Sequence, residues 1–155
     1  MMAEIPVEEY LCTRIRRTEQ ALMGHHEAVL RGHGLTMTQY TVLLTLAREG
    51  GMSGAQLARA CGVTQQTMAT VLTGLQNKGL IVREPSTAHA KVLITTPTEQ
   101  GRRLLDRAYQ EVIVLERALT DAFTSDEHAA FCELLDRATS ILTRQTPRTE
   151  TRSTS

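Results

Sequence analysis

The chain has 155 residues, of which 41% are hydrophobic and 3% aromatic, and its 17 basic and 17 acidic side chains give a formal net charge of zero. This composition suits one modest domain with an aliphatic core that needs neither metals nor disulfides. Three widely spaced cysteines favour a reducing cytoplasm, no signal peptide precedes Pro6, and no apolar run approaches the ~20 residues that span a bilayer. We therefore expect a soluble cytoplasmic protein without membrane contact.

Two helices are expected in the first third of the chain. Pro6 can occupy the first turn of a helix that runs to about Arg31. Thr36 and Gln39 have the spacing of a capping box, which would open a second helix that continues through Ala47. Apolar residues stripe both helices: Val7, Leu11, Ile15, Leu22 and Val29 in the first, and Tyr40, Leu43, Leu44 and Ala47 in the second.

A helix-turn-helix is expected next, with helices over residues 53–61 and 65–78. Ser53 and Gln56 form a second capping box, and Thr64 can cap the second of these helices. An apolar stripe marks one side of that helix, and the opposite side is uncharged but able to form hydrogen bonds. The residues on the opposite side are Gln66, Thr70, Thr73 and Asn77. Such a face suits a helix that enters the major groove of DNA.

A β-hairpin is expected directly after the helix-turn-helix. Residues 80–82 and 92–95 are β-prone, and residues 85–90 between them are polar and rich in turn formers. This order of elements is typical of a winged helix-turn-helix. Residues 48–103 contain seven basic and three acidic side chains, so this segment carries +4 and the remainder −4. The winged helix-turn-helix region, called the head below, is thus the basic part of a neutral protein, as expected for a region that contacts phosphates.

Two further helices are expected towards the C-terminus. Thr96, Pro97 and Glu99 indicate the start of a long helix, and a break at residues 124–125 precedes a final helix. Their apolar residues have the three- and four-residue spacing of helices that pack along another helix. These residues are Leu105, Ala108, Val112, Leu115, Leu119 and Ala122, then Phe131, Leu134, Leu135, Ala138, Ile141 and Leu142.

The expected fold is therefore mainly α: a winged helix-turn-helix of about six helices and a two-stranded β wing, in a single compact domain. Its regions are a dimerisation helix (1–34), the DNA-binding region (35–100), dimerisation helices (101–143) and a disordered tail (144–155). The terminal helices could instead complete a monomer core. We favour a homodimer because three long striped helices exceed what one small head can cover.

The sequence predicts a DNA-binding regulator that contacts bases from the second helix of the helix-turn-helix and phosphates from basic side chains around it. Gln65 and Gln66 could read adenine edges. The full set of expected contacts is Ser53, Arg59, Thr64, Gln65, Gln66, Thr67, Thr70, Thr73, Lys78, Arg83, His89 and Lys91. An enzyme is not expected, because the chain has no phosphate loop, no Gly-x-Ser-x-Gly and no zinc-hydrolase histidine pair. No cofactor is expected either.

From about Val7 to Leu142, the chain resembles the MarR family of bacterial transcriptional regulators. The segments that carry the resemblance are Gly34-Leu35-Thr36-x-x-Gln39-Tyr40, Leu57-Ala58-x-x-Cys61-Gly62-Val63-Thr64, Leu75-x-x-x-Gly79-Leu80-Ile81-x-Arg83 and Thr98-x-x-Gly101-Arg102. The resemblance implies a triangular homodimer, joined by its terminal helices, whose two winged heads bind palindromic double-stranded DNA. Such regulators usually repress, and release DNA when a small molecule or an oxidant reaches the cleft between dimer and head.

The chain departs from this family pattern where DNA is read. The wing tip of the family commonly has an aspartate followed by arginines, and this chain has His89, Ala90 and Lys91 there. The recognition helix of the family commonly has an arginine where this chain has Thr70, and often another where it has Gly74. Both losses weaken the electrostatic part of DNA binding. We expect weaker or more salt-sensitive binding, and the alternative is a winged-helix module that binds another protein.

The resemblance also places Cys12 where hydroperoxide-sensing members keep a reactive cysteine, which gives a second alternative: a thiol-based oxidant sensor. The tyrosines that surround that thiol in those members are replaced here by Arg16, His26 and Met37. Arg16, one turn from Cys12, could favour its thiolate, whereas a small apolar role for Cys12 is the simpler interpretation. Cys61 and Cys132 are expected in the core.

A cleft for a small aromatic or amphipathic effector is expected by the same analogy, lined by Arg16, His26, Met37 and Tyr40. No metal site is expected. His25 and His26 point about 100° apart on a helix, and His33 follows the end of that helix. No His-x-x-x-His or carboxylate pairing supports an ion shared by these three side chains.

Overall fold

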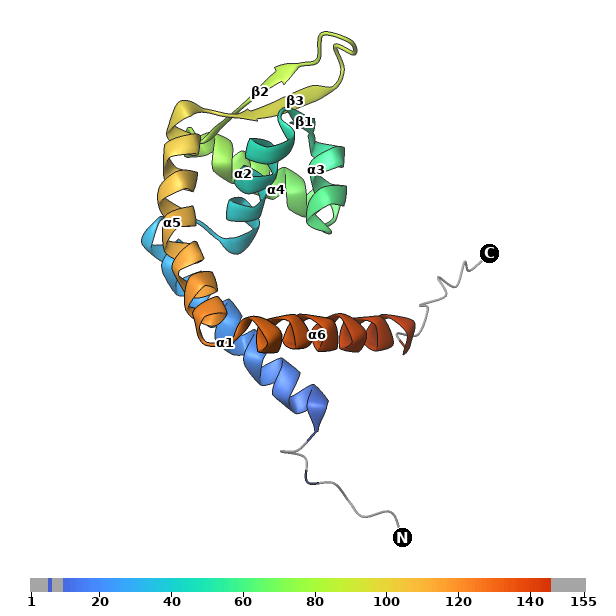
Figure 1. Cartoon of the computed structure of the whole chain (residues 1–155). Helices are drawn as coiled ribbons and strands as arrows, with labels where there is room; N and C mark the ends of the chain where they lie inside the picture. Colours follow the sequence, from blue (N-terminus) through green and yellow to red (C-terminus); the bar gives the residue numbers. More distant parts are fainter. Residues whose placement is uncertain (1–5, 7–9, 146–155) are drawn as a thin grey trace, which may run out of the picture. The chain divides into compact units, whose positions relative to one another are not determined.

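The computed structural model describes Pro6 and residues 10–145, and Figure 1 shows its elements. In chain order they are α1 (Leu11–Gly32), α2 (Met37–Glu49), β1 (Met52–Ser53), α3 (Gly54–Cys61), α4 (Gln65–Asn77), β2 (Ile81–Pro85), β3 (Leu93–Pro97), α5 (Glu99–Asp121) and α6 (Ser125–Gln145). The chain forms two compact units, and the boundary between them falls after Ile113, within α5. In the described part of the chain, no helix has the length and apolar character to cross a membrane.

The capping residues expected from the sequence begin α2, α3 and α4. Thr36 and Ser53 each form a complete capping box, with Gln39 and Gln56 respectively. Thr64 Oγ1 accepts a hydrogen bond from the backbone N–H of Thr67 at 3.1 Å. Each cap satisfies amides that have no partner within the helix, and so fixes where that helix begins.

Two predicted helix starts are wrong. α5 begins at Glu99, because Pro97 is the buried last residue of β3, paired with Ile81, and Thr98 caps the helix by accepting from the Gly101 amide at 3.0 Å. The described part of α1 begins at Leu11, and Pro6 is exposed and lies outside any helix. A proline permits a helical first turn but does not enforce one, since its fixed φ also suits extended chain. Val7, predicted in the α1 stripe, lies outside the described residues.

The sheet has three antiparallel strands in the order β1-β3-β2, one more than the predicted two-stranded wing. β1 pairs Met52 with Thr95 and Ser53 with Ile94. A strand of two residues has no readable periodicity, which is why the sequence did not indicate it. The β2–β3 hairpin with its tip, residues 81–97, is called the wing below, and in Figure 1 it extends beyond the helices of the head.

The core of the first unit is aliphatic, as expected. Leu43, Leu46, Leu57, Leu72 and Leu75 are all fully buried, and they come from α2, α3 and α4. In α2 the buried residues are those at positions 39, 40, 42, 43 and 46. The predicted inward position of Ala47 is wrong: its side chain is exposed, although it follows Leu43 by one turn, and it lies in the last turn of the helix beyond the last buried residue, Leu46.

The second unit contains the end of α5 and all of α6. Thr124 and Glu127 cap α6 reciprocally: the Thr124 N–H donates to Glu127 Oε2 at 2.9 Å, and the Glu127 N–H donates to Thr124 Oγ1 at 3.3 Å. α6 has no buried residue, and Cys132, predicted in the core, is exposed. α6 also includes residues 144 and 145, predicted as the start of a disordered tail, because its helical hydrogen bonding continues that far. Residues 146–155 lie outside the described part.

Candidate nucleic-acid interface

The turn between α3 and α4 sets the position of α4. Gly62 adopts a left-handed backbone conformation (φ 66°, ψ 31°) that ends α3, a conformation that glycine adopts without steric cost. The Val63 N–H donates to the Ala58 carbonyl at 3.0 Å. Met68, Leu72 and Leu75 are buried beneath α4. The opposite face of α4 is therefore held outward by a packed core.

A groove of about 460 Å³ lies between the start of α3, α4 and the wing. Four of the predicted DNA contacts line it together: Ser53, Gln65, Arg83 and Lys91. Its full lining is Ser53, Gly54, Ala55, Gln65, Met68, Ala69, Leu72, Arg83, Lys91, Val92 and Leu93. The tertiary structure thus brings the first residue of α4 and two cations of the wing to one surface.

The two wing cations differ in their surroundings. Arg83 is half-buried, and its Nε atom is buried with no hydrogen-bond partner among the described residues. Its guanidinium packs close to Gly54, where an added Cβ would lie 3.8 Å from Arg83 Nη2. Lys91 is exposed near the tip of the wing. Arg83 is therefore preplaced by packing, and Lys91 is free to follow a ligand.

Lys78 has a different environment from the one its sequence position suggested. Its ammonium donates to the Gly34 carbonyl at 2.6 Å and to Gln39 Oε1 at 2.9 Å. These bonds tie the end of α4 to the α1–α2 turn and to α2. At Gly74, an added Cβ would lie 3.1 Å from Gln39 Nε2, so a larger residue there would press on the same amide.

The other predicted DNA contacts lie on exposed parts of the head. Thr64, Gln66, Thr67, Thr70 and Thr73 are exposed at the cap or on the outer face of α4. Arg59 is exposed on α3 and His89 at the wing tip, where Ser86 Oγ accepts from the backbone N–H groups of residues 88 and 89.

Four apolar residues of the groove were missed by the sequence analysis: Ala55, Ala69, Val92 and Leu93. Ala69 lies one helical turn after Gln65, so helical periodicity alone could have identified it. Val92 and Leu93 belong to a run that was predicted only as β-prone, and their side chains are 38% and 40% exposed. No signal in the sequence distinguishes these two positions from buried strand residues.

The predicted effector residues are distributed over two helices. Arg16 is exposed on α1, about 15 Å along the helix axis from His26. Tyr40 is buried in the core, and this burial, followed by the neighbouring Tyr109, raises its pKa. Met37 lines a separate hollow of about 300 Å³, together with Glu27, Arg31, Leu35 and Thr36.

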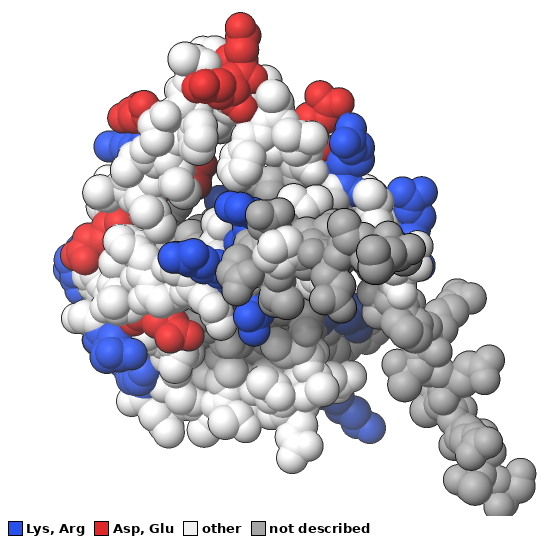
Figure 2. All heavy atoms as spheres, turned by 90° about the horizontal axis from the view of Figure 1, so that it is seen from below, with Lys and Arg blue, Asp and Glu red and all other residues white. Residues whose placement is uncertain are grey.

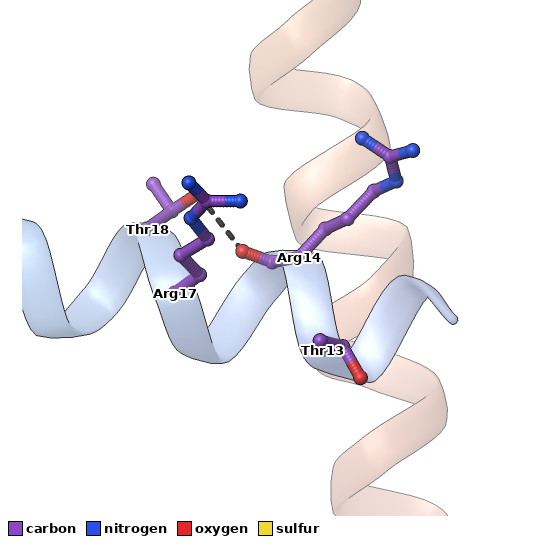
Figure 3. Close-up of a pocket in the computed structure, with 4 residues that line it drawn as sticks. All are labelled: Thr13, Arg14, Arg17 and Thr18. Atoms are coloured by element: carbon purple, nitrogen blue, oxygen red, sulfur yellow. Dashed lines mark hydrogen bonds between the residues drawn. The ribbon is translucent and has the colours of Figure 1, made fainter. Parts of the chain in front are cut away.

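The first helix carries a further basic hollow, shown in Figure 3. Arg14 and Arg17 extend to the same side of α1, and the Thr18 hydroxyl donates to the Arg14 carbonyl at 3.0 Å. Cys12, directly before Thr13 at the edge of this hollow, is exposed.

The histidines do not gather around a common centre. His33 Nε2 lies 3.1 Å from Glu111 Oε1, which links the end of α1 to α5, and the rings of His25 and His26 are 6.1 Å apart. Among the described residues, no three His, Cys, Asp or Glu side chains are placed to share a metal ion.

Charge on the molecular surface is mixed. On the face shown in Figure 2, lysine and arginine side chains are interspersed with aspartate and glutamate among uncharged residues. This agrees with the net charge of zero. Any attraction for nucleic acid must therefore come from local cations such as Arg83 and Lys91.

Comparison with known proteins identifies the family. The sequence model of the MarR family matches residues 33–91. An HTH-type transcriptional repressor of Mycobacterium tuberculosis is 33% identical over 121 residues, which cover 78% of this chain and 87% of that protein. Two solved structures share the fold. The transcriptional repressor CouR bound to a 23-mer DNA duplex has a TM-score of 0.76 at 24% identity, covering 90% of this chain and 99% of that one.

The second is BpsR of Bordetella bronchiseptica, whose DNA binding is regulated by 6-hydroxynicotinic acid. It has a TM-score of 0.74 at 20% identity, covering 88% of this chain and 98% of that one. The match to the family model includes α2, α3, α4 and the start of the wing, which form the head described above. The chain therefore belongs to the MarR family of helix-turn-helix, DNA-binding transcriptional regulators.

Proposed function

We propose that this protein is a repressor that binds palindromic double-stranded DNA as a homodimer and is released by a small aromatic or amphipathic molecule. The observation that carries the proposal is the groove in which Ser53, Gln65, Arg83 and Lys91 meet beside the outward face of α4. A helix held by its core with an uncharged polar outer face suits the major groove. The adjacent cations of the wing suit the phosphate backbone.

Dimerisation is supported by the apolar surface of the terminal helices. α6 has no buried residue, and its exposed large apolar side chains are Phe131, Leu134, Leu135, Ile141 and Leu142. In α1, Leu11 is 75% exposed. Helices with this much exposed apolar surface are stabilised by packing against a second copy. A two-fold dimer would also present two heads to two half-sites of one palindrome.

Release by an effector is supported by the regulation of the structurally similar BpsR by 6-hydroxynicotinic acid. In this chain we place the effector near the hollow at the α1–α2 junction, where Arg31 and Met37 offer a cation beside an apolar side chain. An aromatic carboxylate would suit that combination. His26 remains a proposed contact beside this hollow. Arg16 lies about 22 Å along α1 from Arg31 and is too far away to share the site, and Tyr40 is buried in the core.

The test is fluorescence anisotropy with the DNA upstream of the protein's own gene, against a scrambled duplex, across a salt series. Specific binding at one dimer per site that weakens with salt is expected. Lys91→Ala should lower the affinity and flatten the salt slope by about 0.9 for each phosphate that the variant no longer neutralises. Arg117→Ala, which removes the same charge outside the head, is the matched control and should leave the slope unchanged.

Equal and feeble binding to both duplexes would contradict the proposal and favour a module that binds protein. If specific binding is found, 6-hydroxynicotinic acid and related aromatic carboxylates should be titrated into the complex. Displacement of the DNA by such a compound, abolished in Arg31→Ala, would support the effector site. Displacement that is unchanged in Arg31→Ala would place the effector elsewhere.

A further inference from the structure

We propose that α4 selects A·T base pairs, reading thymine methyl groups with Ala69 and Thr73 and adenine edges with Gln65 and Gln66. This inference rests on the proposed DNA-binding function and names the sequence class that the head would prefer. It comes from the chemistry of one helix face rather than from any single residue.

The outer face of α4 lacks the side chains that read guanine. The commonest specific contact in the major groove is an arginine or lysine that donates twice to guanine O6 and N7. None of the 13 residues of α4 is charged. The nearest lysine, Lys78 at the end of the helix, donates to Gly34 and Gln39 instead. This helix therefore has no cation to place on a guanine edge.

The threonine hydroxyls of this face are occupied by the helix itself. Thr70 Oγ1 donates to the Gln66 carbonyl at 3.3 Å, and Thr73 Oγ1 donates to the Ala69 carbonyl at 2.9 Å. Both side chains are exposed. With their donor hydrogens turned to the backbone, they offer a ligand a methyl group and an acceptor oxygen. The methyl groups of Thr70 and Thr73, together with that of exposed Ala69, make an apolar strip on the otherwise polar outer face of α4.

The two glutamines at the start of α4 are free to read bases. Gln65 and Gln66 are exposed, and their amide groups have no hydrogen-bond partner among the described residues. A carboxamide donates and accepts at once, which matches the N7 acceptor and the N6 donor of adenine. Adenine and thymine face the major groove side by side in one base pair, so a glutamine and a methyl strip can read the same A·T tract.

The spacing along the helix fits a short tract. Gln65, Ala69 and Thr73 follow one another at intervals of four residues and so form one row, with Gln66 and Thr70 in a neighbouring row. From Gln65 to Thr73 the row spans about 12 Å at 1.5 Å per residue. That length covers about three to four base pairs at 3.4 Å each. The wing cations contact phosphates, which position the head but carry no sequence information.

The experiment is a selection from a random 24-base-pair duplex library with the full-length protein, followed by anisotropy on the enriched duplex. We expect paired half-sites with runs of A·T pairs. Replacing the thymines of both half-sites with uracil removes only their C5-methyl groups and should weaken binding about threefold to tenfold, from the area of a few methyl contacts. Replacing adenine with 7-deazaadenine removes the N7 acceptor and should weaken binding similarly.

Matched variants at one position separate the methyl group from the hydroxyl. Thr73→Val keeps the methyl group and should keep the full preference for thymine over uracil. Thr73→Ser keeps only the hydroxyl and should show a smaller preference, with the remainder due to Ala69. Position 73 is exposed, so both variants should fold, as circular dichroism would verify. Equal binding of thymine and uracil duplexes by the unaltered protein would overturn the inference.

The two proposals fail in different ways. Enriched half-sites with invariant guanine at the positions that α4 protects would overturn the A·T inference but leave the DNA-binding function intact. A library with no enriched sequence would overturn both.

Discussion

Replacing Gly101 with alanine should destabilise this protein strongly, although it places a better helix former in α5. An added Cβ would lie 2.1 Å from the Leu80 carbonyl oxygen and 3.0 Å from its carbon. Both atoms belong to the backbone immediately before β2, so no side-chain rotation can relieve the overlap. The chain at one of the two sites must shift by about 1 Å to restore ordinary van der Waals contact.

The magnitude follows from the bonds around this contact. The Leu80 carbonyl also accepts from the Thr98 N–H at 3.0 Å, and the Thr98 hydroxyl donates to the Gly79 carbonyl at 2.7 Å. Overpacking costs about 1–3 kcal/mol, and weakening one or two of these hydrogen bonds adds about 1 kcal/mol each. The higher helix propensity of alanine offsets up to about 1 kcal/mol of this loss in stability. We expect the free energy of unfolding to fall by about 2–4 kcal/mol in total.

The assay is urea and thermal unfolding of the full chain, at one protein concentration because a dimer's stability depends on it. Gly24→Ala in α1 is the matched control, since its added Cβ meets nothing within 4 Å and its φ is not positive. The control should be as stable as the unaltered protein or up to about 1 kcal/mol more stable. A Gly101→Ala protein as stable as the control would refute the claim that α5 approaches Leu80 too closely for a side chain.

Three further predictions concern other parts of the molecule. Lys78→Met should lower the free energy of unfolding by about 1–2 kcal/mol, because it removes the hydrogen bonds to Gly34 and Gln39. The salt dependence of DNA binding should stay the same in this variant. A weaker salt dependence would instead make Lys78 a phosphate contact. Leu135→Glu should shift the dimer to monomer in light scattering and weaken DNA binding, whereas Glu133→Ala on the opposite face of α6 should do neither. Burial raises the pKa of Tyr40 above its ordinary 10.0, so the folded state holds this proton more tightly than the unfolded state does. The stability that results is fully present below pH 10 and is lost as the pH rises through the folded-state pKa. Unfolding measured above pH 10 should show a shallower decline in Tyr40→Phe, and equal declines would contradict this assignment.

The order and the boundaries of most elements could be predicted from the sequence, because they depend on local chemistry. Thr36, Ser53 and Thr64 cap the helices that they were expected to cap, since a capping bond is made within four residues. The spacing of Met68, Leu72 and Leu75 likewise indicated which face of α4 is buried. The family resemblance rested on these same local patterns.

Features that depend on residues far apart in the chain emerged only with the tertiary structure. β1 exists because Met52 and Ser53 meet β3, which lies about forty residues later. Pro97 completes a strand instead of opening a helix, because its pairing with Ile81 and its burial outweigh its preference for a first turn. Lys78 bonds to Gly34, 44 residues away, and so differs from Lys91, which the sequence alone presents as an equivalent cation. Local sequence thus fixes caps and stripes within a few residues, whereas the partners of each strand edge and each charge depend on long-range packing.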